Sequence, residues 1–249
     1  MDWHSDGGTR WLSADLPEGR AAFSTRLGGV SDPPFEGLNL GILTDDEREA
    51  VTENRHRLAA ALGLPPERIA IGRQVHGAEL QELSGPQEPS SFAEPGAAEL
   101  AEVDGHLTAE DGLAPLVFVA DCLPVALAGP GGVAMLHCGW RGLAGGIVAR
   151  GVEAIGATDA AIGPGIGPCC YEVGDQVLDA LSGLGPGIAS GRMLDLAAAT
   201  VRLLNRAGVD RIEAAGLCTS CDESLFFSHR RDAGRTGRQA GLVWIERGN

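Results

Sequence analysis

The sequence predicts an α/β (α+β) protein. Short apolar runs bounded by glycine and proline are typical of buried strands, and between them lie segments whose apolar residues recur at helical spacing. The clearest runs are 116–120 and 133–136, separated by a glycine/proline turn at 128–132. With 249 residues, 44% of them hydrophobic, the chain suits one large domain or two small ones and is long enough to bury a core.

The charge of the chain excludes several function classes. A formal net charge of −15 argues against a broad surface for nucleic acid or for an anionic membrane. All 19 basic residues are arginine, so the chain has neither a Schiff-base lysine nor the lysine of a P-loop. Any phosphate that the protein handles must therefore meet a local group of arginines.

The N-terminal sequence MDWHSDGGTRW has neither the basic region nor the apolar region of a signal peptide. No apolar run reaches the ~18 residues expected of a membrane helix. The six cysteines are too few for a disulfide scaffold in a chain of this length. We therefore expect a cytoplasmic protein with reduced thiols.

Two expected strands in the first third of the chain lead into segments that carry candidate site residues. Residues 23–31 are expected to form a strand that breaks into a glycine-rich loop, where Arg26 could bind an anion. Residues 69–77 are expected to form a strand with His76 at its end. A lone histidine at a strand end is more often structural than a ligand, so its role depends on its neighbours in the fold.

Between these strands, the pattern over 45–62 predicts a helix. Asp45 or Asp46 is the expected N-cap, and a glycine at 63 with a proline at 65 ends the helix. Asn54 and Arg55 fall in the middle of the helix, where we expect them to be solvated.

A loop rich in proline, serine and glutamate is expected over 84–98, followed by a strand over 103–108. Asp104 and His106 have the same side-chain parity on that strand, so both could face one cavity.

The segment 115–142 contains the most suggestive pair of residues. If its two apolar runs form a hairpin about 130–131, Cys122 lies nearly opposite Gly139 and diagonal to His137. Diagonal neighbours on paired strands are roughly 7–8 Å apart at the backbone, so both side chains can reach one ion. A thiolate and an imidazole at the ends of buried strands predict a site.

The second half of the chain is expected to contain three more helices. The first, over 143–156, follows a glycine-rich turn in which Arg141 could bind an anion near the helix N-terminus. A strand beginning near 160 then leads into a rigid glycine/proline loop that lacks the G-x-G-x-x-G spacing of a dinucleotide site. The other two helices are expected over roughly 174–182 and 195–207.

Cys218 and Cys221 form a Cys-x-x-Cys motif. As zinc ligands they would need a second pair, and none exists at the usual spacing. As a redox motif they would need a thioredoxin-like context, which the order of elements does not offer. The sequence therefore favours partly buried thiols.

The C-terminal segment 226–238 concentrates arginines, among them Arg230, in an otherwise acidic protein. A solvated charge run and an anion site are both compatible with this pattern.

Taken together, eight segments resemble the laccase-domain family of multi-copper polyphenol oxidoreductase-like proteins, which includes purine nucleoside phosphorylases. The resemblance covers nearly the whole chain in order. The segments are STRLGGVS (24–31), RQVHG (73–77), VDGHLT (103–108), ADCLPV (120–125), HCGWRG (137–142), GPGIGPCCYEV (163–173), DLAAATVRLLNRAGV (195–209) and FFSHRRDAGRTGR (226–238).

The resemblance implies a metal site of two histidines and one cysteine, which here are His76, Cys122 and His137. It implies one domain over residues 1–249, with layered mixed β-sheets flanked by helices in a cysteine-hydrolase-like toxin fold. The implied activity is phosphorolysis of adenosine, inosine and S-methyl-5'-thioadenosine, together with adenosine deaminase activity. The expected partners are a small-molecule nucleoside and phosphate, without nucleic acid or membrane, and we expect a monomer.

The chemistry of these residue types agrees with the resemblance. One cysteine and two histidines suit Zn²⁺, with Cu²⁺ as an alternative, and leave a fourth position open. Holding phosphate in line with a ribose carbon is a task for arginines, for which the candidates are Arg26, Arg73, Arg141 and Arg230.

Two acidic residues and two departures from the family pattern complete the candidate site. Asp104 or Asp121 could orient a histidine ligand or carry a proton. Cys138 stands where alanine is commoner in the family, and His106 is a candidate extra ligand or proton carrier that the pattern does not require.

Three other interpretations stay open. Cys122 could be the nucleophile of a cysteine hydrolase with His137 as its base, acting on peptidoglycan precursors. A copper-dependent polyphenol oxidoreductase is less well supported, because a multicopper enzyme needs many histidines and the chain has six. A non-enzymatic, metal-dependent binding partner of another protein is the third.

Overall fold

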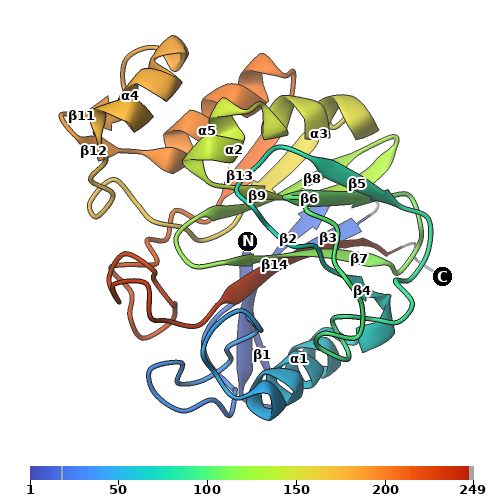
Figure 1. The fold of residues 1–249 in the computed structure, drawn as a ribbon. Helices are drawn as coiled ribbons and strands as arrows, with labels where there is room; N and C mark the ends of the chain where they lie inside the picture. Colours follow the sequence, from blue (N-terminus) through green and yellow to red (C-terminus); the bar gives the residue numbers. More distant parts are fainter. Residues whose placement is uncertain (18, 247–249) are drawn as a thin grey trace.

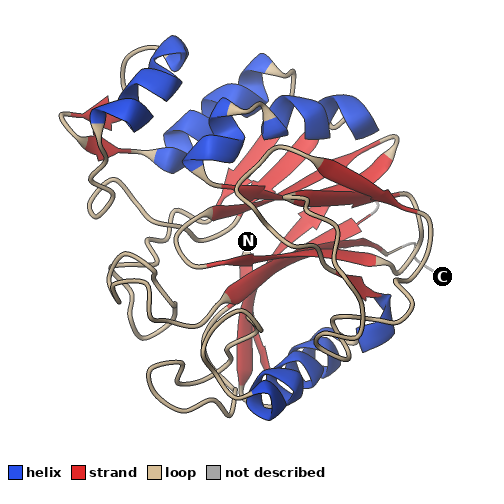
Figure 2. Cartoon of the chain, in the orientation of Figure 1, coloured by secondary structure: helices blue, strands red, loops and turns tan. Residues whose placement is uncertain are grey.

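Two six-stranded mixed sheets stack face to face in the computed structural model, which describes residues 1–17 and 19–246 (Figure 1). Helix α1 (Arg48–Leu62) lies on the outer side of the first sheet, and helices α2 (Trp140–Ala144), α3 (Ile147–Ile155) and α5 (Leu196–Arg206) cover the second (Figure 2). The predicted layered mixed sheets flanked by helices are thereby confirmed, whereas the likeness to cysteine-hydrolase-like toxins stays a prediction.

Each sheet combines strands from distant parts of the chain. The first has the order β1 (Asp2–Asp6), β2 (Thr9–Leu16), β3 (Gly19–Ser24), β14 (Gln239–Ile245), β7 (Ala114–Val119) and β4 (Ile69–Ala70). The second has the order β13 (Arg211–Ala214), β10 (Asp159–Ile162), β8 (Leu123–Gly129), β9 (Gly132–Cys138), β6 (Gly105–Thr108) and β5 (Leu80–Leu83). Outside them lie α4 (Asp175–Leu181), the short pair β11 (Ala189–Ser190) and β12 (Met193–Leu194), and 3-10 turns at Pro66–Arg68 and Ser182–Leu184.

Strand β8 shows how the layers are held together. Its side chains alternate, with Val125 and Leu127 packed under the helices and Ala126 and Ala128 packed against the first sheet. Successive side chains of a strand point to opposite faces, so one strand contributes to both cores. A strand buried on both faces reads as a continuous apolar run, which is why the sequence shows no alternation here.

The predicted hairpin is right in its turn and wrong in one of its strands. The partner of β9 is β8, paired Leu123 with Cys138 and Pro124 with His137. The run ending at Val119 is β7, which lies in the first sheet between β14 and β4. The apolar stretch is divided at Asp121, whose φ of +95° turns the chain from one sheet to the other.

Helix α1 differs from its prediction in two respects. Asp46 is not its N-cap: the Ncap position is Glu47 without a side-chain cap, while the Asp46 carboxylate accepts hydrogen bonds from Ser31 and Asn39. Gly63 ends the helix in the left-handed conformation as predicted.

Asn54 and Arg55, expected to be solvated, are fully buried. The Arg55 guanidinium donates to the carbonyls of Leu40 and Ser91 and lies over the ring of Phe92. A buried guanidinium is stabilised by such acceptors, so Arg55 joins α1 to the 84–98 loop instead of facing water.

Two further elements are shorter than predicted. The strand expected over 69–77 ends at Ala70, so His76 lies in a loop, and the helix expected over 143–156 divides into α2 and α3 at Gly145–Gly146. The predicted helices over 174–182 and 195–207 are confirmed as α4 and α5. Among the described residues, no helix combines the length and apolar character needed to cross a bilayer.

His106, on β6, is a core residue with 1% of its surface exposed. Its Nδ1 atom is buried and without a hydrogen-bond partner in the described part of the chain. Burial lowers the pKa of His106 to about 4, because the charged ring would lose its hydration. The ring is therefore neutral at physiological pH and is a poor proton carrier there.

We expect the free energy of unfolding to fall by ~2 kcal/mol between pH 7 and pH 5 on account of His106. The pKa of His106 in the folded protein lies below the ordinary value. As the pH is lowered, the unfolded chain therefore takes up the proton first, and the folded state loses stability. Urea denaturation of the protein and of the variant His106→Met at both pH values measures this. An equal loss of stability in the two proteins would contradict the prediction.

Candidate metal centre

Three side chains from separate segments converge where β8 begins and β9 ends, in the middle of the second sheet. His76 comes from the loop after β4, Cys122 from the crossing between β7 and β8, and His137 from β9. Their candidate ligand atoms lie within 4.8 Å of one another, and the two imidazole rings meet edge to face with centroids 4.8 Å apart. The structure thus brings together all three residues that the sequence singled out as ligands.

Gly139 leaves room for this cluster. A Cβ atom at this position would lie 3.0 Å from the Cys122 sulfur and 3.4 Å from the His76 ring. The backbone at Gly139, with φ −85° and ψ 167°, is one that any residue can adopt. Glycine is therefore needed at this position to leave space beside the thiol, and not to allow the turn.

The carboxylate of Asp104 organises the site from behind. It is fully buried and accepts hydrogen bonds from the backbone N–H groups of Val75, His76 and Gly77 at 3.1, 2.9 and 2.6 Å. Three successive N–H groups around one anion form a concave nest, which accommodates the left-handed conformation of His76 at φ +59°. The loop that carries His76 is thereby held by a residue outside it.

The same carboxylate lies 2.7 Å from Nδ1 of His137. A carboxylate at Nδ1 holds the proton there and leaves Nε2 as the free ligand atom, which is the arrangement found behind many zinc-binding histidines. Burial raises the pKa of Asp104, but the His137 ring and the Gly77 and Val75 N–H groups outweigh it and hold this pKa below its ordinary value.

Cys122 and His137 form a strongly coupled pair. Burial raises the pKa of Cys122, but the nearby His137 and His76 lower it to about 6. Burial lowers the pKa of His137, but the Cys122 thiolate and Asp104 raise it to about 9. Without a metal, the pair is therefore a thiolate beside an imidazolium at neutral pH.

Cys138, next to His137, belongs to the core and not to this cluster. Its side chain is fully buried among the apolar residues under the helices. Burial and the nearby Cys122 and Asp104 charges raise the pKa of Cys138, so it stays a thiol.

The donor set fits a transition metal. A thiolate and two imidazoles are borderline-soft ligands suited to zinc or copper, and three protein ligands leave a fourth position open, as in catalytic zinc sites. His76 is exposed and Cys122 partly exposed, so this open side is accessible to solvent.

Asp121 has a different role from Asp104. Its carboxylate accepts hydrogen bonds from the Thr219 hydroxyl and from the backbone N–H of Arg230, each at 2.7 Å. These contacts join the crossing that carries Cys122 to two loops from the C-terminal third of the chain.

The four candidate arginines have different surroundings. Arg141 lies over the Trp140 ring, and Arg230 lies over the Tyr171 ring while donating to the carbonyl of Glu172. Arg26 instead donates to the carbonyls of Glu36 and Glu223 beside an open hollow of ≈ 570 Å³ whose lining includes none of the three candidate ligands. Arg73 pairs with Glu102 on the surface.

Sequence reasoning missed two residues beside the cluster. Burial and the negative charges of Cys122 and Asp121 raise the pKa of Tyr171 to about 12, while Arg230 and Arg141 act in the opposite direction. Burial lowers the pKa of Arg238, and Asp121 and Cys122 partly offset it. Tyr171 is the only tyrosine in the chain, and Arg238 ends the arginine-rich segment. These two features could have singled out both residues from the sequence.

Comparison with known proteins supports a family assignment. The family model described as multi-copper polyphenol oxidoreductase laccase matches residues 20–246. The purine nucleoside phosphorylase YlmD of Geobacillus stearothermophilus is 40% identical over 257 residues, covering 94% of this chain and 93% of the relative. The purine nucleoside phosphorylase YfiH of Escherichia coli is 36% identical over 243 residues, covering 92% and 95%.

Solved structures agree with this assignment. The crystal structure of YlmD from Geobacillus stearothermophilus superposes with a TM-score of 0.86 at 38% identity, covering 98% of this chain and 99% of the other. That of the Bacillus licheniformis hypothetical protein YfiH superposes with a TM-score of 0.87 at 31% identity, again covering 98% and 99%. The chain therefore belongs to the laccase-like multi-copper polyphenol oxidoreductase family, whose curated relatives are named purine nucleoside phosphorylases.

Proposed function

We propose that this protein is a purine nucleoside phosphorylase that depends on Zn²⁺ bound by His76, Cys122 and His137. The observation that carries the proposal is the open three-ligand cluster, backed by the Asp104 carboxylate and found in a chain whose relatives bear that name. When bound, zinc would supply Lewis acidity and lower the pKa of a water molecule toward ~7.

In phosphorolysis, the bond between the base nitrogen and the ribose C1′ breaks while a phosphate oxygen bonds to C1′. The proton of hydrogen phosphate ends on the departing base, so the reaction balances without another reactant. The protein's task is to hold a dianion in line with C1′, for which Arg141, Arg230 and Arg238 are the proposed residues.

Tyr171 is suited to bind the nucleoside. Because its pKa lies near 12, its hydroxyl keeps the proton at neutral pH and can donate a hydrogen bond. Its ring already lies under the Arg230 guanidinium, so a nucleoside bound at Tyr171 would be close to a phosphate held by Arg230.

The proposal includes adenosine deamination, in which water replaces the exocyclic amine and ammonia leaves. Asp104 would keep the His137 ring oriented through both reactions, because its contact at Nδ1 does not use the open side of the cluster.

A second candidate function is that of a cysteine hydrolase, in which the Cys122 thiolate attacks an acyl substrate such as a peptidoglycan precursor. The observation that favours it is the thiolate–imidazolium pair, with Asp104 behind His137 as the orienting group. A copper-dependent polyphenol oxidoreductase is the weaker candidate, because only two of the six histidines join Cys122 in the described structure.

We expect the purified protein to convert adenosine or inosine to free base and ribose 1-phosphate only when both phosphate and bound metal are present. Cys122→Ser should lose the zinc of this centre, about one ion per chain, together with the activity, because serine is a poor zinc ligand. Elemental analysis and product chromatography measure the two. If Cys122→Ser keeps the metal and loses acyl transfer, the result would favour Cys122 as a nucleophile. If the metal-loaded protein forms no ribose 1-phosphate, the phosphorylase proposal is wrong.

Asp104→Asn should weaken zinc binding roughly 10- to 100-fold, because it removes the charge that orients His137 and holds the His76 loop. Competition with a chromogenic chelator measures the affinity. Glu79→Gln is the matched control, since Glu79 is an exposed acid paired with Arg150 on the surface. Equal zinc affinities in the two variants would show that Asp104 does not support metal binding.

Arg141→Ala and Arg230→Ala should each raise the KM for phosphate roughly 10-fold or more, because a hydrogen bond between charged groups contributes roughly 1.5–3 kcal/mol. Arg73→Ala, which breaks only the surface pair with Glu102, should leave this KM unchanged. Steady-state rates at varied phosphate test both. An effect at Arg73 equal to that at Arg230 would contradict the assignment.

A further inference from the structure

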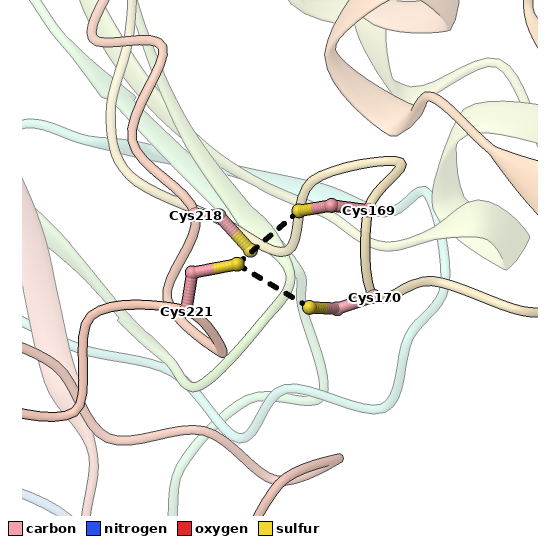
Figure 3. Close-up of side chains that lie close together, drawn as sticks. All are labelled: Cys169, Cys170, Cys218 and Cys221. Atoms are coloured by element: carbon pink, nitrogen blue, oxygen red, sulfur yellow. Dashed lines mark hydrogen bonds between the residues drawn. The ribbon is translucent and has the colours of Figure 1, made fainter.

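Four cysteines form a second cluster, which shares no residue with the centre at His76, Cys122 and His137. Cys169 and Cys170 come from the loop after β10, and Cys218 and Cys221 from the segment after β13 (Figure 3). Their sulfur atoms all lie within 4.8 Å of one another. The sequence offers Cys218 and Cys221 no second pair at the usual spacing of a zinc site, but the fold supplies one, because Cys169 and Cys170 approach Cys221 from 52 and 51 residues away.

The spacing of the sulfur atoms suits one metal ion. The Cys221 sulfur lies 3.3 Å from that of Cys169 and 3.4 Å from that of Cys170, well beyond the ~2.05 Å of a disulfide. A tetrahedral zinc with Zn–S bonds of about 2.3 Å places its sulfur ligands about 3.8 Å apart. The 3.3 and 3.4 Å separations are slightly shorter than that value, and all four sulfur atoms lie within 4.8 Å of one another, which leaves space for a single ion and not for a multi-iron cluster.

The backbone around the cluster is already held in place. The N–H of Gly167 donates to the Cys218 sulfur at 3.2 Å, and the N–H of Thr219 donates to the carbonyl of Gly165 at 3.0 Å. N–H donors to sulfur favour the thiolate, which is the form that binds metal. A Cβ at Gly167 would approach Cys169 and Cys218 to 3.3–3.5 Å, so glycine lets the two loops lie this close.

We propose that Cys169, Cys170, Cys218 and Cys221 bind one Zn²⁺ as a closed tetrathiolate site, distinct from the centre at His76, Cys122 and His137. Binding forms four Zn–S bonds and releases the thiol protons to solvent, so no oxidant or reductant is involved. With all four positions taken by protein, the ion has a structural role.

The consequence of such a site reaches Cys122. The loop of Cys169 and Cys170 contacts Asp121 through the N–H of Ile166, and the segment of Cys218 and Cys221 contacts it through the hydroxyl of Thr219. An ion that joins these two segments would therefore fix both partners of the crossing at Asp121. Cys169 and Cys221 are exposed, so a chelator or a thiol reagent can reach the site.

The test is the metal content of the full-length protein, purified under reducing conditions without chelator. The variant His76→Ala/His137→Ala, which disables the other centre, should retain about one zinc per chain. In that background, Cys169→Ser/Cys221→Ser should lose this zinc, whereas Ser220→Ala, in the same turn, should keep it. Because no activity is measured, the result does not depend on the proposed phosphorylase.

A thiol titration with a mercurial reagent decides the case if the cysteine variant does not fold. In the His76→Ala/Cys122→Ala/His137→Ala variant, where the buried Cys138 is the one thiol outside the cluster, zinc should be released in step with modification of four thiols. Absence of zinc with four freely reactive thiols would overturn the proposal. So would a mass 2 Da lower from a disulfide, bound iron instead of zinc, or zinc that persists in a folded cysteine variant.

Discussion

The Asp104 carboxylate is the group on which the candidate centre depends. A buried carboxylate loses its hydration, so it is stable only when several donors replace the lost water. Here the donors are three backbone N–H groups of the His76 loop and the ring of His137. One charge thus holds both histidines, and the backbone carbonyl of Asp104 adds a hydrogen bond from the N–H of His137 at 2.7 Å.

The third ligand is set by the passage of the chain between the two sheets. Strand β7 ends in the first sheet and β8 begins in the second, so Cys122 stands where the chain crosses. The left-handed conformation of Asp121 makes the crossing, and its carboxylate is held by groups 98 and 109 residues further along the chain. The position of the thiol therefore depends on loops that the local sequence does not contain.

The two leading functions use the same atoms in different states. In the absence of metal, a proton on His137 and a charge on Cys122 stabilise each other, which is the condition for a cysteine nucleophile. A divalent ion would displace that proton and bind both groups, together with His76. Whether the site is a nucleophile or a metal centre is thus decided by a competition between a proton and a metal ion for Cys122 and His137.

Local patterns in the sequence determined much of this protein. Periodicity and turn residues predicted the helices ending at Leu62 and Arg206 and the turn between β8 and β9. Motif resemblance singled out His76, Cys122 and His137, which the structure brings together. Only the tertiary structure decided that β8 pairs with β9, that Arg55 is buried and that two distant cysteine pairs meet. The physical reason is that burial, hydrogen-bond partners and ligand sets are formed between segments far apart in the chain, and no local pattern records them.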